Sequence, residues 1–276
     1  MTVSRREQVL SYGIPVVFAI VAIYPILSIV LLAFHKKSDL VTGFSIPDHL
    51  SFDTFSRAWT LGGFDHGLVN SFIVAASVAV VTAILSAPAG YAFGTMRFRG
   101  SGTLFYLLLI GLIFPYEATV IPLYYVFNDA GITDTLWALI LPQIGLSVPF
   151  GTFWMRAFFR STPISLVEAS RLDGASSFVT LWRVLLPHAW PAITTMLVLV
   201  FMWTWNEFLL ALVMIQSDDL RTAPLGLALF AGANRGTLYT TLVAAAAVLV
   251  ALPVMIVYVF LQRSFIRGMF AGAVKE

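Results

Sequence analysis

A tryptophan, an amide and a carboxylate stand close together in an otherwise apolar part of the chain. Trp203, Asn206 and Glu207 combine an aromatic face with hydrogen-bonding groups, which suits stacking on a sugar ring and bonding its hydroxyls. An ionisable group inside an apolar run is costly and is usually functional. We therefore predict that these three residues, together with Tyr124, line a candidate substrate path.

A second carboxylate, Glu117, interrupts another apolar run and lies between Pro115 and Pro122. Proline breaks or kinks a helix, so polar backbone groups should face a cavity at this point. Glu117 therefore joins the candidate path. For Glu117 and Glu207 an alternative remains open, in which each acid pairs with a neighbouring subunit or lies at the membrane interface.

Residues 162–187 form a polar insert with the signals of a helix, a turn and a second helix. Thr162 before Pro163 predicts a helix start with a hydroxyl cap, and the helix should run to about Leu172. The pair Asp173-Gly174 should end it, since glycine accepts the left-handed conformation. Ser176 or Ser177 then caps the second helix, and an apolar stripe follows: Phe178, Leu181, Trp182 and Leu185.

Such a helical pair has two possible locations: the lipid interface or a groove in another protein. Interfacial helices favour Lys and Arg on the polar face. This insert mixes Glu168, Arg171 and Asp173 and carries the small residues Ala169 and Ser170. The mixed charge and the small residues favour insertion into a protein groove.

The elements that must position these residues are membrane helices. The 276 residues are 59% hydrophobic and 11% charged, and the mean hydropathy is +0.90. A helix needs about 20 apolar residues to cross a bilayer. We predict an all-α integral membrane protein, with one transmembrane domain over residues 1–276 and six spans near 12–34, 67–96, 101–127, 135–158, 187–216 and 236–262. Ser86, Gly90 and Gly94 give the second span a stripe of small residues, which predicts close helix packing.

The basic residues orient the spans, because Lys and Arg favour the cytoplasmic side. With six spans both termini share one face, and taking that face as cytoplasmic places 11 of the 16 basic residues inside. They are Arg5, Arg6, Arg97, Arg99, Arg156, Arg160, Arg171, Arg183, Arg263, Arg267 and Lys275. The polar insert, in the loop 159–187 between the fourth and fifth spans, is then cytoplasmic, as is the tail 263–276.

Several classes of chemistry are excluded or disfavoured by what the sequence lacks. There is no cysteine, and the four histidines show no metal-ligand spacing, so no metal site is predicted. The topology accounts for the basic residues, so no nucleic-acid partner is predicted. A phosphate-binding loop needs a lysine after glycine, and none of Lys36, Lys37 and Lys275 has one. This chain therefore cannot hydrolyse ATP by that route.

Two other classes of membrane protein fit the sequence less well. An ion-coupled secondary transporter would use intramembrane carboxylates, but such proteins usually show inverted repeats, and we find none. A membrane-embedded enzyme would need a constellation such as H-E-x-x-H or G-x-S-x-G, and these are absent.

The insert resembles the EAA loop of binding-protein-dependent ABC importer permeases. Glu168-Ala169-Ser170, Gly174, Val184 and Leu186-Pro187 match its spacing, with Ser170 and Val184 as mild departures. Other stretches make the chain similar to the smaller, six-span permease of maltose-type carbohydrate importers: VNSFIVAA (69–76), AGYAFGTMRFRG (89–100), VIPLYYVFNDAGITDT (120–135), WNEF (205–208) and GMFAGAVK (268–275).

The resemblance implies an assembly in the cell (inner) membrane of a bacterium or archaeon. Its other members would be a second related permease, two ATPase subunits that bind ATP and Mg²⁺, and an extracytoplasmic sugar-binding protein. The insert would be a coupling helix pair seated in an ATPase cleft, through Glu168, Ala169, Ser170, Asp173, Gly174, Leu186 and Pro187. The tail would insert between the ATPase subunits.

The resemblance also assigns the external loop 216–235. Leu225, Gly226, Leu227 and Gly232 suit a flexible apolar finger that reaches into the binding protein. Most substrate contacts would come from the partner permease.

Overall fold

The computed structural model describes residues 5–36, 39, 41, 43–236 and 239–271, and within these ranges all regular elements are helices. This confirms the predicted all-α class. In chain order the elements are α1 (Arg5–Ala33), α2 (Asp53–Gly62), α3 (Phe64–Thr95), α4 (Ser101–Ile113), α5 (Glu117–Asp129), α6 (Trp137–Ser161), α7 (Ile164–Leu172), α8 (Ser177–Val179), the π-helical η1 (Thr180–Leu185), α9 (Leu186–Trp205), α10 (Leu209–Met214), the 3₁₀ turn η2 (Asp218–Leu220), α11 (Ala223–Ala233) and α12 (Thr240–Ala271).

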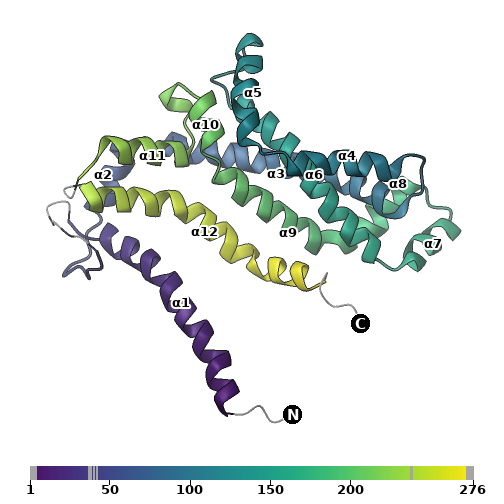
Figure 1. Cartoon of the computed structure of the whole chain (residues 1–276), viewed down its shortest axis with the longest axis horizontal. Helices are drawn as coiled ribbons and strands as arrows, with labels where there is room; N and C mark the ends of the chain where they lie inside the picture. The colour runs from purple at the N-terminus through teal and green to yellow at the C-terminus, as the bar shows by residue number, and fades with distance from the viewer. Residues whose placement is uncertain (1–4, 37–38, 40, 42, 237–238, 272–276) are drawn as a thin grey trace. The chain divides into compact units, whose positions relative to one another are not determined.

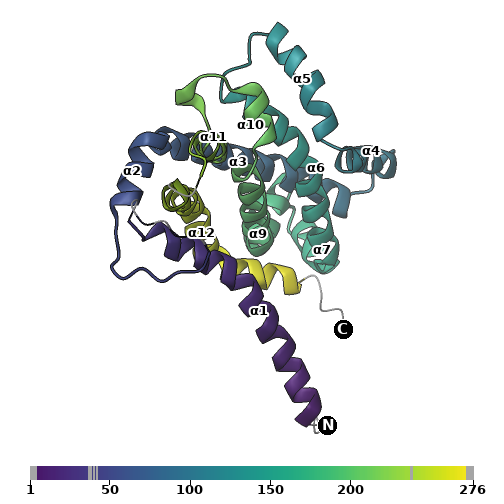
Figure 2. The same ribbon diagram turned by 60° about the vertical axis from the view of Figure 1, so that its left-hand side comes forward.

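Five stretches are long and apolar enough to cross a membrane: Ser11–Ala33, Phe64–Thr95, Trp137–Ser161, Ser177–Trp205 and Thr240–Phe260. A sixth arises if α4 and α5 count as one broken span, since they meet at 96°. Figures 1 and 2 both show α5 projecting away from α4. The break includes Pro115, as the sequence predicted, because proline removes a backbone donor and resists helix continuation.

The fifth span differs from its predicted bounds of 187–216 at both ends. It begins at Ser177, because α8, η1 and α9 follow one another without a loop. Pro187 is the second residue of α9 and Pro191 lies inside the helix, directly after the π-helical η1. At the other end α9 stops at Trp205, and α10 starts only at Leu209. Of the predicted C-terminal tail (263–276), residues 272–276 lie outside the described residues.

The chain divides into two compact units. The first comprises Met1–Asp65 and Gly226–Leu252. In it the Thr54 hydroxyl donates to the Ala33 carbonyl over 2.6 Å, which ties α2 to the end of α1. The Phe34 ring packs on Phe52 and Phe55 at centroid distances of 5.4 and 5.1 Å. Most of α1 is exposed, so its apolar surface is available to lipid or to another subunit.

The second unit, His66–Leu225 and Pro253–Glu276, carries most of the candidate site. Here α3 and α6 approach so closely that an added Cβ at Gly90 would lie 2.5 Å from Met155 Cβ. At Gly94 it would lie 3.2 Å from Phe159 Cβ, and Gly151 of α6 faces Ser86 in the same way. The predicted small-residue stripe therefore packs α3 against α6.

Helix α9 completes the core of this unit on α6. The Trp154 indole N–H donates to the Ala192 carbonyl over 3.0 Å. Met155, Met196 and Leu185 are almost wholly buried between the helices. In Figures 1 and 2, α3, α6 and α9 lie side by side, with α7 at one end of the three. The insert thus lies at one end of the packed helices α3, α6 and α9.

Candidate functional site

The first helix of the insert, α7, begins without the predicted hydroxyl cap. The Thr162 hydroxyl donates instead to the Phe158 carbonyl of α6 over 3.2 Å, and Pro163 stands at the cap position. The prediction of a Thr162 cap was therefore wrong. A threonine at the end of one helix can bond back to that helix, and here this competes with capping the next one. The extended backbone at Pro163, with ψ 127°, then turns the chain into α7.

The end of α7 is the turn that the sequence predicted. Gly174 has φ +78°, in the left-handed region. Its N–H donates to the Arg171 carbonyl, and the Ala175 N–H donates to the Ser170 carbonyl, each over 3.0 Å. This pair of bonds is a Schellman motif, which satisfies two carbonyls that the helix end would leave free. The second helix then starts at Ser176, whose hydroxyl accepts from the Val179 N–H over 3.4 Å.

Ser170 holds the two helices of the insert together. It is buried, and its hydroxyl donates to the Val167 carbonyl over 2.8 Å and lies 2.9 Å from the Thr180 hydroxyl of η1. Leu181 and Leu185 are buried on the same side. Ser170, one of the predicted coupling residues, therefore lies inside the insert and not on its surface.

An exposed apolar edge surrounds the turn. Leu172 is 89% exposed, Phe178 70% and Trp182 48%, and the Phe178 and Trp182 rings pack at a centroid distance of 5.8 Å. The predicted single apolar stripe is therefore split, because Leu181 and Leu185 face inward. Glu168 and Asp173 are exposed and supply a polar rim beside the edge; Ala169, Gly174 and Pro187 are exposed too, while Leu186 is half-buried. An apolar centre with a polar rim is the composition of a protein-binding surface.

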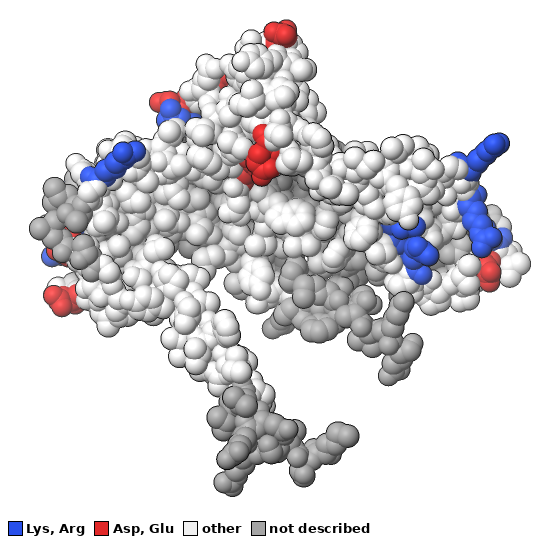
Figure 3. Space-filling model, in the orientation of Figure 1, with Lys and Arg blue, Asp and Glu red and all other residues white. Residues whose placement is uncertain are grey.

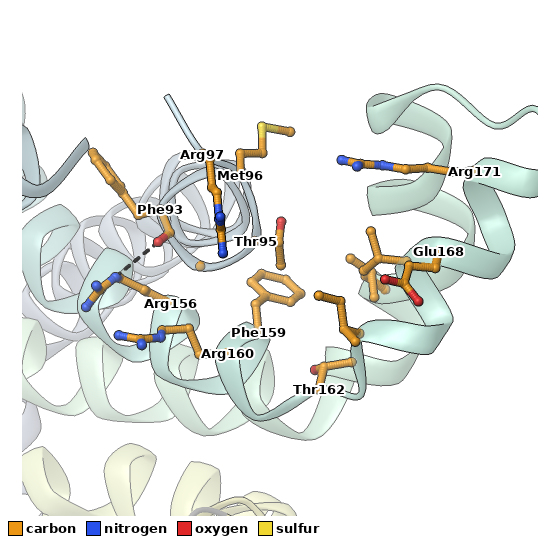
Figure 4. Close-up of a pocket in the computed structure, with 14 residues that line it drawn as sticks. Phe93, Thr95, Met96, Arg97, Arg156, Phe159, Arg160, Thr162, Glu168 and Arg171 are labelled. Carbon is orange, nitrogen blue, oxygen red and sulfur yellow. Dashed lines mark hydrogen bonds between the residues drawn. The ribbon is translucent and has the colours of Figure 1, made fainter. Parts of the chain in front are cut away.

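A cavity of about 450 Å³ lies behind the insert, against the ends of α3 and α6. Figure 4 shows Arg97, Arg156 and Arg160 at one side of it and Arg171 and Glu168 at the other. Figure 3 shows basic side chains gathered at this end of the second unit. The lining consists of Phe93, Gly94, Thr95, Met96, Arg97, Arg156, Phe159, Arg160, Thr162, Ile164, Val167, Glu168, Arg171 and Leu185. The sequence had explained these arginines by topology alone and did not predict a cavity.

The breaks in the third and fifth spans are tied to each other. The Tyr116 hydroxyl, between α4 and α5, donates to Glu207 Oε1 over 2.5 Å. The same oxygen accepts from the Leu210 N–H over 2.8 Å, which satisfies a free donor at the start of α10. Glu207 therefore has partners within the chain, and Tyr116 is a site residue that the sequence reasoning missed.

The other candidate path residues lie around these breaks. Glu117 begins α5 and is exposed, while Tyr124 is half-buried and packs edge-on to Tyr125. Trp203 is half-exposed and packs on Phe150 at 4.6 Å. The Asn206 amide donates to the Met202 carbonyl over 2.7 Å, which leaves its carbonyl oxygen for other partners. The structure thus brings Glu207 to Tyr116, which is next to Glu117 in the chain.

A second, apolar cavity of about 450 Å³ adjoins the same breaks. It is lined by Tyr116, Thr119, Val120, Leu123, Phe127, Leu141, Pro142, Gly145, Leu146 and Leu210. Because α5 leans away from α4, this cavity opens between α5, α6 and α10. Its walls suit an apolar side chain or a sugar's apolar face more than a charged group.

The predicted flexible finger over 216–235 is wrong for most of its length, since Ala223–Ala233 forms α11. Leu225 is only 1% exposed and belongs to the core, whereas Gly226 and Leu227 are half-buried and Gly232 is exposed. Asn70 anchors the approach to α11 through bonds of 2.7 and 3.1 Å from its amide to the Asp219 and Arg221 carbonyls. Of the four predicted contact residues, Leu225 is therefore not available at the surface.

The carboxylate of Asp134 holds the turn at Gln216 and Ser217 in place, and Asp134 itself has φ +57°. Its carboxylate accepts from the Gln216 and Ser217 N–H groups over 2.9 Å each and from the Ser217 hydroxyl. The bonds from Ser217 and Gln216 lower the pKa of Asp134 below its ordinary value. Among the described residues, no group of three His, Cys, Asp or Glu side chains could hold a metal ion.

Comparisons with known proteins agree over most of the chain. The family model of the binding-protein-dependent transport system inner membrane component matches residues 79–270. The chain is 35% identical over 262 residues to the probable ABC transporter permease protein YurM of Bacillus subtilis, covering 94% of this chain and 85% of that protein. It is 32% identical to the trehalose transport system permease protein SugB of Mycobacterium tuberculosis, covering 92% of this chain and 93% of SugB.

The diacetylchitobiose uptake system permease protein NgcG of Streptomyces coelicolor is 29% identical, over 99% of this chain and 89% of NgcG. Among solved structures, the crystal structure of a bacterial ABC transporter involved in the import of the acidic polysaccharide alginate matches with a TM-score of 0.77. The sequence identity is 27%, and the match covers 96% of this chain and 99% of that one.

Proposed function

This chain belongs to the family of binding-protein-dependent transport system inner membrane components, and we propose that it forms half of the membrane path of a carbohydrate importer. It is a permease subunit of an ABC importer and not an enzyme. Importers of this kind combine permease, ATPase and substrate-binding components. The comparisons with sugar permeases support a carbohydrate as the transported substrate.

The insert is the element that we assign to coupling. One observation carries this assignment: α7 and α8–η1 form a hairpin closed by the Gly174 turn, with Leu172, Phe178 and Trp182 exposed at its edge. An isolated surface hairpin gains nothing from exposing three large apolar side chains, whereas a partner cleft would bury them. Since Ser177–Trp205 is one helical run, a displacement of the hairpin would be passed directly to the fifth span.

The proposed assembly has a second related permease, two ATPase subunits and an extracytoplasmic sugar-binding protein. The distribution of Lys and Arg supports cytoplasmic N- and C-termini and a cytoplasmic insert. ATP and Mg²⁺ would be bound by the ATPase subunits, because this chain has no phosphate-binding loop.

The substrate path would pass the two helix breaks, where Glu117, Trp203 and the Asn206 carbonyl offer polar and aromatic groups. Exposed Gly232 and half-buried Leu227 remain candidates for contact with the binding protein. Glu207 would act by holding the breaks in register, through its bonds to Tyr116 and Leu210.

Uptake by the reconstituted complex tests the proposal. The permease pair, the ATPase and the binding protein are placed in vesicles with ATP inside, and radiolabelled trehalose, diacetylchitobiose and melibiose are offered outside. We expect uptake of a sugar that requires all components and ATP. Uptake by this chain alone, driven by a proton or sodium gradient, would instead establish the secondary-transporter alternative.

A further inference from the structure

The cavity behind the insert has the composition of an anion site. Four arginines and a single carboxylate, Glu168, contribute charged side chains to its lining. Its volume of about 450 Å³ lies within the range of about 300–1,000 Å³ that is typical of small-molecule pockets. A net positive lining in a concave site attracts negative charge more strongly than the same arginines would on a flat surface.

One of the arginines is already held in place for binding. The Arg156 Nε donates to the Phe93 carbonyl over 3.2 Å, and its guanidinium lies 3.9 Å from the centroid of the Phe105 ring. These contacts fix the plane of the group and use only one of its five N–H bonds. The two terminal nitrogens have no hydrogen-bond partner within the described part of the chain, and their fork matches two oxygens of a phosphate.

The other three arginines of the lining lie at or just beyond the ends of three helices. Arg97 lies just beyond the end of α3, Arg160 in the last turn of α6 and Arg171 in the last turn of α7. None of the three has an ion pair among the residues that the structure describes, although Glu168 lines the same cavity. Their positive charges are therefore not neutralised within the chain.

The position of the cavity indicates which class of anion can reach it. It lies where two candidate spans, Phe64–Thr95 and Trp137–Ser161, come to an end, and we infer from this position that lipid headgroups can reach it. Its walls also include apolar side chains, among them Phe159, Val167 and Leu185. Basic pockets at the ends of membrane helices bind the headgroups of anionic lipids.

We propose that this cavity binds a phosphate ester, supplied by an anionic phospholipid such as phosphatidylglycerol or by a soluble phosphate ester. The phosphate would bridge Arg156 and Arg160 of α6 to Arg97 and Arg171, and so brace the insert against the ends of α3 and α6. The site would make the position of α7 dependent on the ligand. This last consequence rests on the proposed function, but the binding itself does not.

Binding is measured on the complete importer in nanodiscs of phosphatidylcholine with an equal share of phosphatidylglycerol, by counting the lipids retained in native mass spectrometry. The wild type should retain phosphatidylglycerol in preference to phosphatidylcholine. Replacing both Arg97 and Arg160 by Gln should weaken this retention roughly 30-fold, since each basic residue near an anionic lipid contributes about a fivefold gain. The matched control replaces Arg57 and Arg235, which do not line the cavity.

A second variant should change lipid retention in the opposite direction, which a misfolded protein would not do. Glu168→Gln removes the one negative charge of the lining, so it should increase retention of phosphatidylglycerol. A soluble source is tested by adding glycerol 1-phosphate to nanodiscs of phosphatidylcholine alone. Binding there that requires Arg97 and Arg160 would assign the site to a soluble phosphate ester.

Three results would overturn the proposal. They are equal retention in the Arg97 and Arg160 variant and the wild type, equal losses in that variant and in the control, or retention only when the ATPase subunits are removed. The last would mean that an acidic side chain of the ATPase fills the cavity. The effect on function is followed separately, as ATP hydrolysis against the fraction of phosphatidylglycerol. If the binding protein did not stimulate ATP hydrolysis although the lipid was still retained, the result would contradict the proposed function but not the proposed binding site.

Discussion

Substitutions at Gly174 separate the shape of the turn from contacts made at that position. An added Cβ would meet no atom within 4 Å, so the chain itself leaves room for a side chain. The backbone does not, because φ is +78°. The left-handed conformation costs an L-residue other than glycine about 1–2 kcal/mol, and most of all a β-branched one. We therefore expect Gly174→Ala to cost about 1 kcal/mol and Gly174→Val about 2 kcal/mol or more.

A cost of this size lowers the ratio of correctly turned to misplaced hairpins by roughly 5- to 30-fold. Asparagine adopts the left-handed conformation more readily, so Gly174→Asn should retain most of the function although it is larger than alanine. The assay is ATP hydrolysis by the reconstituted complex, with and without sugar-loaded binding protein. Stimulation should fall in the order Gly, Asn, Ala, Val. The control is Gly102→Ala, a helical position with open space around its Cβ, which should lose nothing.

If Gly174→Asn were as damaging as Gly174→Val, side-chain volume would matter more than φ, and direct contact with a partner would explain the glycine. Full stimulation of the Gly174→Val complex would refute the reasoning from the turn altogether.

The other predictions concern packing, the helix breaks and the external turn. Gly90→Val should cost about 1–3 kcal/mol and lower the unfolding temperature of the complex, because its Cβ would lie 2.5 Å from Met155 Cβ. The control Gly145→Ala, in open space, should leave that temperature unchanged. Equal unfolding temperatures for the Gly90→Val complex and the wild type would contradict the α3–α6 packing. Tyr116→Phe removes the donor to Glu207 and should lower the maximal uptake rate at an unchanged amount of protein in the membrane, whereas an unchanged rate would mean that this bond does not hold the path in register. Asp134→Ala should speed hydrogen exchange at the Ser217 amide. Since the folded-state pKa of Asp134 is lowered, the carboxylate contributes fully to wild-type stability above its unfolded pKa of about 3.9, and this contribution is lost as the pH falls through the folded-state value. If exchange at pH 7 were as slow in the variant as in the wild type, the result would contradict the role of the Asp134 carboxylate in holding this turn.

Features set by local chemistry were predictable from the sequence. The Gly174 turn depends on one residue's conformational freedom, and the break before Glu117 depends on Pro115. The stripe of Gly90 and Gly94 predicted a close helix contact, although not that α6 would be the partner. Each of these signals lies within a few residues of the feature that it determines.

Features set by distant contacts were not predictable. No glycine or proline near Asn206 predicts a helix stop, yet α9 ends there and Glu207 bonds to Tyr116, 91 residues away along the chain. Thr162 has the type of a cap residue, but the neighbouring turn of α6 takes its hydroxyl. Leu225 lies in a stretch with the composition of a loop, yet α11 buries it. The cavity arginines come from the segment after α3 and from the helices α6 and α7, so no spacing in the sequence could reveal their proximity.

The central claim is that the hairpin α7–η1 lies against an ATPase subunit. The chain contains no cysteine, so one introduced thiol can carry a photoreactive label at a chosen point. Ala169 is exposed on the hairpin, and exposed Asp129 at the end of α5 serves as the control. After labelling Ala169→Cys and Asp129→Cys with benzophenone maleimide in the active complex, illumination should cross-link the first to the ATPase and not the second. A fully active complex in which the label at Ala169 reacts only with lipid would place the hairpin in the membrane interface and contradict the account.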